Sequence, residues 1–359
     1  MLEDIGFTVT PKPYQPATDN DSNSARLPPG LEIHTMKIYR NLEEIEKPLR
    51  KPYVTIGNFD GVHLGHQILF SEVVSRAYKH QGTSVVITFH PHPLQVVRPE
   101  AGIKLISTEE QKIELIEMAN IDVLVILPFT REFAATPAST FVDQVLIKTI
   151  GVEHLVVGYD YAMGKGREGN IDFLKAQGRE KGFPVTVVEP FYVDDMLASS
   201  TKVRALVTGG KMRDVRKLLG RNYQIRGEVR RGKQRGGPVV GFPTANLAIS
   251  PEDLCPRHGV YVTQVIYDGK CYGGVLNIGY NPTFGGDQLV AETHIFDFNQ
   301  DIYGKPIKIN LLRFLRGERK FSGPEELAAQ IARDVEEAKQ VLADAQKEIL
   351  LSCEERYNR

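Results

Sequence analysis

The sequence lacks the many cysteines and the long apolar runs that are typical of disulfide-rich, zinc-binding and membrane proteins. It has 359 residues, no tryptophan and only three cysteines, Cys255, Cys271 and Cys353, which are widely separated. An odd number of cysteines without a CxxC pair excludes a disulfide framework or a zinc knuckle and is typical of a reducing cytoplasm. No apolar run approaches the roughly 20 residues that span a bilayer, and the first residues lack the basic and apolar segments of a secretory signal. We therefore expect a cytoplasmic protein that has no membrane partner.

An excess of charge of either sign is also absent. The formal net charge is -1, and the hydrophobic (42%) and charged (25%) fractions are ordinary for a globular chain. Such a balance creates no general field that would attract nucleic acid, so we expect no nucleic-acid partner. The length suggests about two domains. Whether the chain associates with itself is not determined by the sequence.

The first half of the chain alternates strand-like and helix-like segments. Residues 1–34 are rich in Pro, Asn, Asp and Ser without an apolar period, which predicts a disordered or extended N-terminal segment. Short apolar runs follow at Tyr53–Ile56, Val85–Phe89, Val123–Leu127, Leu155–Val157 and Val185–Val188. Amphipathic segments such as Ile68–Tyr78 lie between most of them. Residues 35–205 are therefore expected to form an α/β domain, a doubly wound parallel sheet with helices on both faces.

The second half has a different pattern. Residues 206–220 predict a helical connector, and residues 221–345 contain successive strands separated by turn residues such as Asp268-Gly269. The expected strands are Gln224–Val229, Val260–Tyr267, Tyr272–Ile278, Val290–Phe296 and Ile307–Phe314. An apolar stripe from Leu327 to Leu342 predicts a helix after them, and residues 346–359 form a C-terminal tail. This pattern favours an antiparallel Greek-key β-barrel of the six-stranded type, with a C-terminal helix.

The most informative segment is GNFDGVHLGH, residues 57–66, which joins the first strand to the first helix. The free N–H groups and the dipole at a helix N-terminus favour an anion. Beside them, His63 and His66 can donate hydrogen bonds to phosphate oxygens as charge develops during transfer. The alternative is two surface histidines beside a tight turn.

A second segment, SSTKVR at residues 199–204, also offers groups that bind phosphate. Ser200 and Thr201 supply hydroxyls at a helix start, and Arg204 supplies a planar guanidinium. By itself the segment fits a simple helix cap, but the HxGH motif upstream favours the phosphate site. Two other nucleotide motifs are not supported. Residues 164–169 fit GxGxxG but do not follow directly on a strand, and no Gly-Lys pair precedes the Ser or Thr of a Walker A motif.

A third segment, GFPTANL at residues 241–247, follows a basic, glycine-rich stretch. Thr244 and Asn246 are two residues apart, so on an extended backbone they point the same way. Their oxygens suit a hydrated Mg²⁺ that also binds nucleotide phosphates. The alternative is that this segment is an ordinary turn.

Together these segments resemble the bifunctional riboflavin kinase/FAD synthetases over about residues 35–345. The HxGH segment, residues 88–93 and SSTKVR resemble the synthetase half, and GFPTANL, residues 277–284 and residues 291–298 resemble the kinase half. The chain has Tyr161, Ala162 and Met163 where the family usually has two phenylalanines flanking an arginine. It also has Asn281 where the family usually has arginine.

The resemblance implies ATP-dependent phosphorylation of riboflavin to FMN, then adenylylation of FMN to FAD with release of pyrophosphate. ATP is the co-substrate, Mg²⁺ the metal, and riboflavin, FMN and FAD are the flavin substrates and products. Adenylylation is expected in residues 35–205 and phosphorylation in residues 221–345.

The resemblance also implies roles for individual residues. Glu292 is the expected base of the kinase, while His63 and His66 act in adenylylation. The residues expected to bind ATP or its phosphates are Gly57, Asn58, Phe59, Asp60, Gly65, Ser199, Ser200, Thr201, Arg204, Gly241, Thr244 and Asn246. Thr244 and Asn246 are also the expected metal ligands, and the expected flavin-binding residues are Asp160, His90, Arg313 and Phe321.

Three alternatives stay open at this point. Because Tyr161–Met163 departs from the usual pattern, the chain can also be a riboflavin kinase with a weakened or inactive adenylyltransferase half. Another cofactor adenylyltransferase or an aminoacyl-tRNA synthetase would share HxGH, although the charge balance gives no tRNA-binding domain. A non-catalytic flavin-binding regulator would be expected to lose His63, His66 or Glu292, and all three are present.

Overall fold

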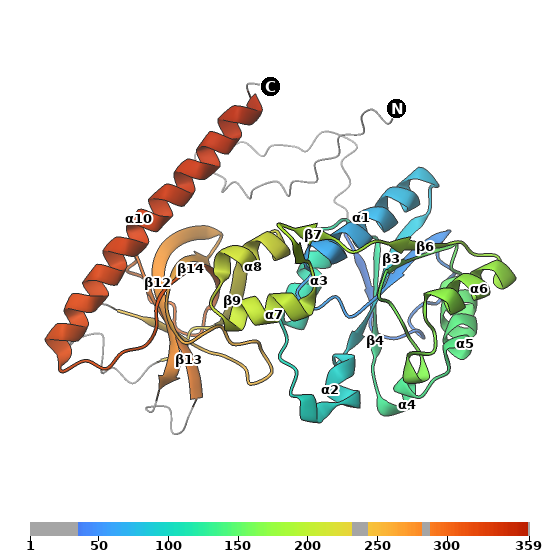
Figure 1. Cartoon of the computed structure of the whole chain (residues 1–359), viewed down its shortest axis with the longest axis horizontal. Helices are drawn as coiled ribbons and strands as arrows, with labels where there is room; N and C mark the ends of the chain where they lie inside the picture. The colour runs from blue at the N-terminus through green and yellow to red at the C-terminus, as the bar shows by residue number, and fades with distance from the viewer. Residues whose placement is uncertain (1–34, 232–242, 282–287, 358–359) are drawn as a thin grey trace.

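A six-stranded parallel sheet forms the first half of the molecule (Figure 1). The computed structural model describes residues 35–231, 243–281 and 288–357. The sheet has the order β1-β4-β3-β2-β5-β6. Its strands are β1 (Lys37–Tyr39), β2 (Pro52–Ile56), β3 (Thr83–His90), β4 (Val123–Pro128), β5 (His154–Gly158) and β6 (Val185–Val188). The strand order reverses between β2 and β5, and α/β sheets bind ligands at the carboxyl ends of the strands beside such a reversal.

Helices cover both faces of this sheet. The helices packed on it are α1 (Leu64–Lys79), α3 (Glu109–Glu117), the π-type helix η2 (Phe141–Ile150) and α6 (Ile171–Lys181). Shorter helical segments lie in the connections: α2 (Pro93–Val97), η1 (Pro99–Ala101), α4 (Arg131–Ala134), α5 (Ala138–Thr140) and η3 (Lys165–Arg167). Because side chains alternate along a strand, Val86 packs with Phe70 of α1, whereas Val85 and Ile87 pack with Leu146 of η2 on the other face. This alternation produces the expected three-layer arrangement.

Two helices connect the sheet to the second half. They follow a short hairpin, β7 (Tyr192–Val193) and β8 (Met196–Leu197), and are α7 (Ser200–Thr208) and α8 (Met212–Leu219). Gly210 separates them with a φ of +71°, a left-handed conformation that favours glycine. The region predicted as one helical connector over residues 206–220 is therefore parts of two helices.

The second half is an antiparallel sheet with the order β10-β13-β12-β11-β14-β9. Its strands are β9 (Tyr223–Glu228), β10 (Ala245–Ala248), β11 (Gly259–Tyr267), β12 (Lys270–Asn281), β13 (Gln288–Ile295) and β14 (Pro306–Arg316). The Arg230 N–H, just after β9, donates to the Asn246 carbonyl of β10 at 2.8 Å, which brings the two edges together as a barrel. The final helix α10 (Pro324–Tyr357) packs outside the barrel against Val262 and Val275 and extends beyond it (Figure 1).

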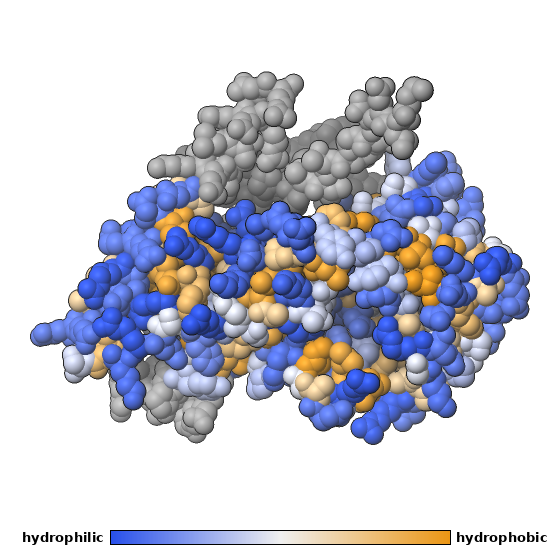
Figure 2. Space-filling model, viewed as in Figure 1, coloured by the Kyte–Doolittle hydropathy of each residue, from blue (hydrophilic) through white to orange (hydrophobic). Residues whose placement is uncertain are grey.

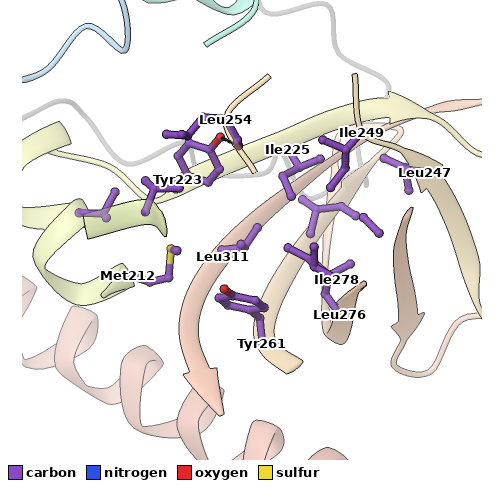
Figure 3. Packing of buried hydrophobic residues seen from close by; sticks show 14 of the residues in the cluster. Met212, Tyr223, Ile225, Leu247, Ile249, Leu254, Tyr261, Leu276, Ile278 and Leu311 are labelled. Atoms are coloured by element: carbon purple, nitrogen blue, oxygen red, sulfur yellow. Dashed lines mark hydrogen bonds between the residues drawn. The ribbon is translucent and has the colours of Figure 1, made fainter. Parts of the chain in front are cut away.

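The barrel interior is filled by large apolar side chains (Figure 3). Tyr261, Leu276 and Leu311 are fully buried there. The same continuous cluster includes Val203 of α7 and Met212 of α8. The helices that leave the parallel sheet are therefore packed on the barrel core, and α7 belongs to both halves of the molecule.

The predicted fold class is confirmed in both halves. The structure also contains strands that the pattern did not predict, β1 at the sheet edge and β10, which is too short to alternate clearly. The helix η2 was also not predicted. Its apolar face becomes recognisable only where Phe141 and Leu146 pack against the sheet.

Candidate active sites

The HxGH segment forms a tight turn between β2 and α1, at the position where the sheet order reverses. His63 is the N-cap of α1 and makes no capping hydrogen bond with its side chain, so its ring stays available. Phe59 and Val62 have φ values of 49° and 40°, an unusual left-handed conformation for such residues. A Cβ added at Gly65 would lie 3.1 Å from the Ala198 carbonyl and 3.2 Å from the His63 ring. A side chain at position 65 would therefore be tightly packed against the histidine ring and the neighbouring chain, which favours glycine there.

The two histidine rings are stacked on each other. The ring centroids of His63 and His66 are 3.6 Å apart and their planes differ by 25°, while Phe59 meets His66 edge-on. The Nδ1 atoms of both histidines are buried and have no hydrogen-bond partner among the described residues. Burial is the main reason why the pKa of His63 is lowered to about 4, with smaller effects from Arg221 and Arg204. Burial also lowers the pKa of His66 well below its ordinary value. Near neutral pH the two rings are therefore uncharged and offer polar N–H groups rather than positive charge.

Asp60 links the HxGH turn to α7. Its carboxylate is buried and accepts hydrogen bonds from the backbone N–H groups of Ile106 (3.0 Å) and Ser107 (3.2 Å), and it is paired with the Arg204 guanidinium. Burial raises the pKa of Asp60, and Arg204 acts in the opposite direction. The Asp60 carboxylate thus fixes the position of the Arg204 guanidinium.

The SSTKVR segment starts α7 beside the HxGH turn. Ser199 caps the helix by accepting from the Lys202 N–H at 3.3 Å, and the Ser200 hydroxyl donates to the Asp60 carbonyl at 3.0 Å. Arg204 also donates through Nε to the Lys104 carbonyl at 2.8 Å, and Thr201 is exposed at the helix start. The structure brings together two segments that the sequence separates widely.

The loops around this turn contain the residues expected to bind flavin. Asp160 follows β5 and is exposed, and its carbonyl accepts from Arg167 at 3.1 Å. His90 is mostly exposed and its Nδ1 lies 2.8 Å from the Glu109 carboxylate. The neighbouring His92 is more enclosed, and burial, with Arg204 and Lys112 nearby, lowers its pKa to about 4. Of the two histidines in this loop, His92 is therefore the one whose pKa is affected by Arg204 and Lys112.

An apolar surface adjoins this loop. Leu94 and Val97 of α2 are exposed, and Figure 2 shows an apolar area over that helix, one of several on this face. Tyr161, in the stretch that departs from the family pattern, has a buried hydroxyl without a hydrogen-bond partner among the described residues.

Arg221 is a site residue that the sequence motifs did not reveal. It follows α8, and its guanidinium donates to the carbonyls of Gly61 (2.8 Å) and Val62 (3.2 Å) in the HxGH turn. Gln67 donates to the Val62 carbonyl and to the Leu219 carbonyl, both at 2.9 Å. Burial lowers the pKa of Arg221 to about 10, so it is still charged at neutral pH. No local pattern marks these contacts, because the bonded residues are far apart in the sequence.

The barrel half places Asn246 and Glu292 directly opposite each other. Asn246 of β10 pairs with Glu292 of β13, and Asn277 of β12 pairs with Glu292 from the other side. The neighbours Leu247 and Ala291 point into the barrel core, so this row of polar side chains lies on the outer face. The amide oxygen of Asn246 is buried without a hydrogen-bond partner among the described residues.

The other residues expected in the barrel site lie in different surroundings. Thr244 is exposed just before β10, and Gly241 lies outside the described residues. Arg313 is exposed and lies 3.9 Å from the Glu337 carboxylate of α10. Phe321 lies under the guanidinium groups of Arg316 and Arg319, 5.8 and 4.8 Å from the ring centroid. The structure thus brings Asn246 and Glu292 together and places Arg313 and Phe321 beside α10.

The amide oxygen of Asn246, which has no hydrogen-bond partner among the described residues, is the group that would contact a metal ion. Among the residues that the structure describes, no group of three or more His, Cys, Asp or Glu side chains is arranged to bind a metal ion. A neutral amide oxygen and a hydroxyl instead fit Mg²⁺ that keeps waters and is bound largely through substrate phosphates.

Comparison with known proteins identifies both halves. The FAD synthetase family model matches residues 45–202, and the riboflavin kinase family model matches residues 219–342. A bifunctional riboflavin kinase/FMN adenylyltransferase from Bacillus subtilis is 37% identical over 307 residues, 84% of this chain and 96% of the relative. The chain belongs to the bifunctional riboflavin kinase/FMN adenylyltransferase family. The resemblance seen in the motifs is thereby confirmed.

Other members of the bifunctional riboflavin kinase/FMN adenylyltransferase family show the same coverage. The Escherichia coli K12 relative is 34% identical over 301 residues, 83% of this chain and 96% of its own length. A crystal structure of a protein named a macrolide-efflux protein, from Streptococcus pneumoniae, has a TM-score of 0.76 and 31% identity. It covers 85% of this chain and 98% of that one. In the described part of this chain, no helix has the length and apolar character needed to cross a bilayer.

Proposed function

We propose that this chain phosphorylates riboflavin to FMN on the barrel and adenylylates FMN to FAD on the parallel sheet, with ATP as the co-substrate of both reactions. The observation that carries the proposal is that each half contains its own assembled group of polar residues. His63 stacks on His66 in the turn whose Asp60 binds Arg204, and Asn246 faces Glu292 on the barrel. No specific observation favours the alternative of an inactive adenylyltransferase half, because its polar residues are present and connected.

Adenylylation needs charge stabilisation and positioning rather than a base. The phosphate of FMN is already anionic near neutral pH, so one of its oxygens can attack the α-phosphorus of ATP as pyrophosphate leaves. The uncharged N–H groups of His63 and His66 can donate to the oxygens on which negative charge increases. Arg204 of α7, fixed by the Asp60 carboxylate and the Lys104 carbonyl, offers further guanidinium N–H groups to the phosphate oxygens.

Phosphorylation of riboflavin needs a base, because the ribityl hydroxyl is neutral and a poor nucleophile. We assign Glu292 to accept the hydroxyl proton as the oxygen attacks the γ-phosphorus of ATP and ADP leaves. Asn246 and Thr244 would hold Mg²⁺, which when bound neutralises charge on the nucleotide phosphates. The orphaned amide oxygen of Asn246 supports this assignment.

The assignment of two separate sites is tested by product analysis. Wild type, His66→Ala and Glu292→Gln are incubated with riboflavin, ATP and Mg²⁺, and riboflavin, FMN and FAD are separated by HPLC. We expect wild type to form FAD, His66→Ala to accumulate FMN without FAD, and Glu292→Gln to form FAD only when FMN is supplied. Parallel loss of both products in His66→Ala would contradict two sites, and near wild-type kinase turnover in Glu292→Gln would exclude Glu292 as the base.

The remaining assignments are part of the same proposal. We place adenylylation in residues 35–205 and phosphorylation in residues 221–345, with both reactions in the cytoplasm. Because α7 packs on the barrel core, we expect the two halves to fold together rather than as independent units.

A further inference from the structure

Lys112 lies at the carboxyl ends of β2 and β3 and belongs to none of the motifs described above. Lys112 lies in the first half of α3, whose start is fixed by a capping box between Thr108 and Gln111. Its ammonium group reaches back over the carboxyl ends of β2 and β3. There it lies 3.5 Å from the Asn58 carbonyl, 3.4 Å from the Thr88 hydroxyl and 3.4 Å from the Phe89 carbonyl.

These contacts satisfy the ammonium group poorly. Hydrogen bonds from nitrogen to oxygen usually measure about 2.7–3.2 Å, and charged ones are shorter still. All three contacts of Lys112 are longer than this, and all three acceptors are neutral. Lys112 is therefore a cation held close to the site without a strong partner.

The nearest acids are already occupied by other groups. Asp60 is paired with Arg204 and accepts two backbone N–H groups. Glu109 lies 2.5 Å from the Arg40 guanidinium and 2.8 Å from His90 Nδ1. Among the described residues Lys112 itself forms no ion pair. Its ammonium group can therefore bind an anion that comes from outside the protein.

The charge of Lys112 lies close enough to His66 and His92 to affect their pKa values. Burial lowers the pKa of Lys112, while Asp60 and Glu109 act in the opposite direction. In turn, the Lys112 charge contributes to lowering the pKa of both His66 and His92. A buried cation without a charged partner is costly, and proteins retain such groups where an anion binds.

We infer that Lys112 is a further phosphate-binding residue of the adenylylation site, where its ammonium group binds the phosphate chain of ATP and the departing pyrophosphate. This inference rests on the proposed function of the sheet half. It adds a compact charge to a site in which the histidines are neutral and Arg204 is paired with Asp60. Arg221 is also charged, but it donates to carbonyls of the HxGH turn at 2.8 and 3.2 Å, whereas every contact of Lys112 is 3.4 Å or longer. The leaving pyrophosphate is the expected anion for Lys112 because it carries more negative charge than the FMN phosphate.

The test compares Lys112→Met and Lys112→Arg with wild type in the full-length chain. Lys175→Met, which changes an exposed lysine of α6, serves as the matched control. We expect Lys112→Met to lower kcat/KM for ATP in FAD formation by roughly 100-fold or more, the loss seen when one stabilising donor is removed. Lys112→Arg, which keeps the charge, should recover part of this loss.

Binding of inorganic pyrophosphate, measured by calorimetry on the same proteins, separates a phosphate-binding role from a structural one. Lys112→Met should weaken pyrophosphate at least ten-fold, leave the KM for FMN unchanged and leave the melting temperature unchanged or higher. If the KM for FMN rises and pyrophosphate binding is unchanged, the ammonium group binds the FMN phosphate and the assignment to the leaving group is overturned.

A lower melting temperature with unchanged pyrophosphate binding and kinetics would overturn the inference. It would mean that Lys112 only stabilises the packing of the ends of β2 and β3. Failure of the proposed function is distinguishable from this result. In that case wild type would form no FAD, whereas pyrophosphate binding would still report on Lys112.

Discussion

Substituting His63 by asparagine should change how the stability of this protein depends on pH. His63 is 6% exposed, and its pKa in the folded chain is lowered to about 4 by burial and then by Arg221 and Arg204. In the unfolded chain its pKa returns to about 6.5. Above pH 6.5 the ring is neutral in both states and contributes no pH dependence. As the pH falls below 6.5 the unfolded state takes up a proton that the folded state resists, so stability decreases until the pH reaches about 4.

The size of the effect follows from the two pKa values. A pKa of about 4 against an ordinary 6.5 corresponds to about 3 kcal/mol of lost stability when the titration is complete. About 2 kcal/mol of this is lost by pH 5. Asparagine does not titrate, so the variant should lose about 2 kcal/mol less than wild type between pH 7.5 and pH 5. For a domain of 150–250 residues that difference corresponds to roughly 4–8 °C in melting temperature.

The assay is thermal unfolding of wild type and His63→Asn at pH 7.5 and pH 5, compared as the difference between the two pH values. Effects of other titrating groups are common to both chains and largely cancel in this difference. His80→Asn, at an exposed histidine at the end of the same helix, serves as the control for loss of a surface histidine. Equal drops in melting temperature for wild type and His63→Asn would refute the argument that a buried, neutral His63 is built into the turn.

Two further predictions follow from groups that support the sites. Arg221→Gln removes the hydrogen bonds to the Gly61 and Val62 carbonyls, so we expect FAD formation to fall by roughly 100-fold because a small misplacement of catalytic groups has that effect. FMN formation in the same sample should be retained, and equal loss of both activities would contradict a role confined to the turn. Asn246→Ala removes the orphaned amide oxygen, so the Mg²⁺ concentration for half-maximal kinase activity should rise about ten-fold, the lower end of the range for lost metal-site groups. An unchanged Mg²⁺ titration would exclude Asn246 as a ligand.

The sequence by itself determined the motifs and most strands of the two sheets, although not β1, β10 or the helix η2. Alternating apolar residues such as Val85, Val86 and Ile87 specify a strand buried on both faces, because side-chain direction alternates along any extended backbone. The HxGH and SSTKVR segments predicted helix starts that offer donors to an anion, since helix N-termini have free N–H groups wherever they occur. The pairing of Asn246 with Glu292 was predicted only as a shared function and became a geometric fact through the register of β10 and β13.

The tertiary structure decided which charges are compensated and what lies beside the sites. The charge of Arg204 is paired with the Asp60 carboxylate, and Arg221, which follows α8, donates to a carbonyl of the HxGH turn. Lys112 has only long contacts to neutral acceptors. Each of these relations joins residues that are distant in the sequence, and neither periodicity nor motif spacing contains information about such pairs. The lowered pKa of His63 arises in the same way, because it depends on the side chains that exclude water from the ring after folding. Local sequence patterns specify local backbone structure and donors, whereas burial and charge balance emerge only when distant segments pack together.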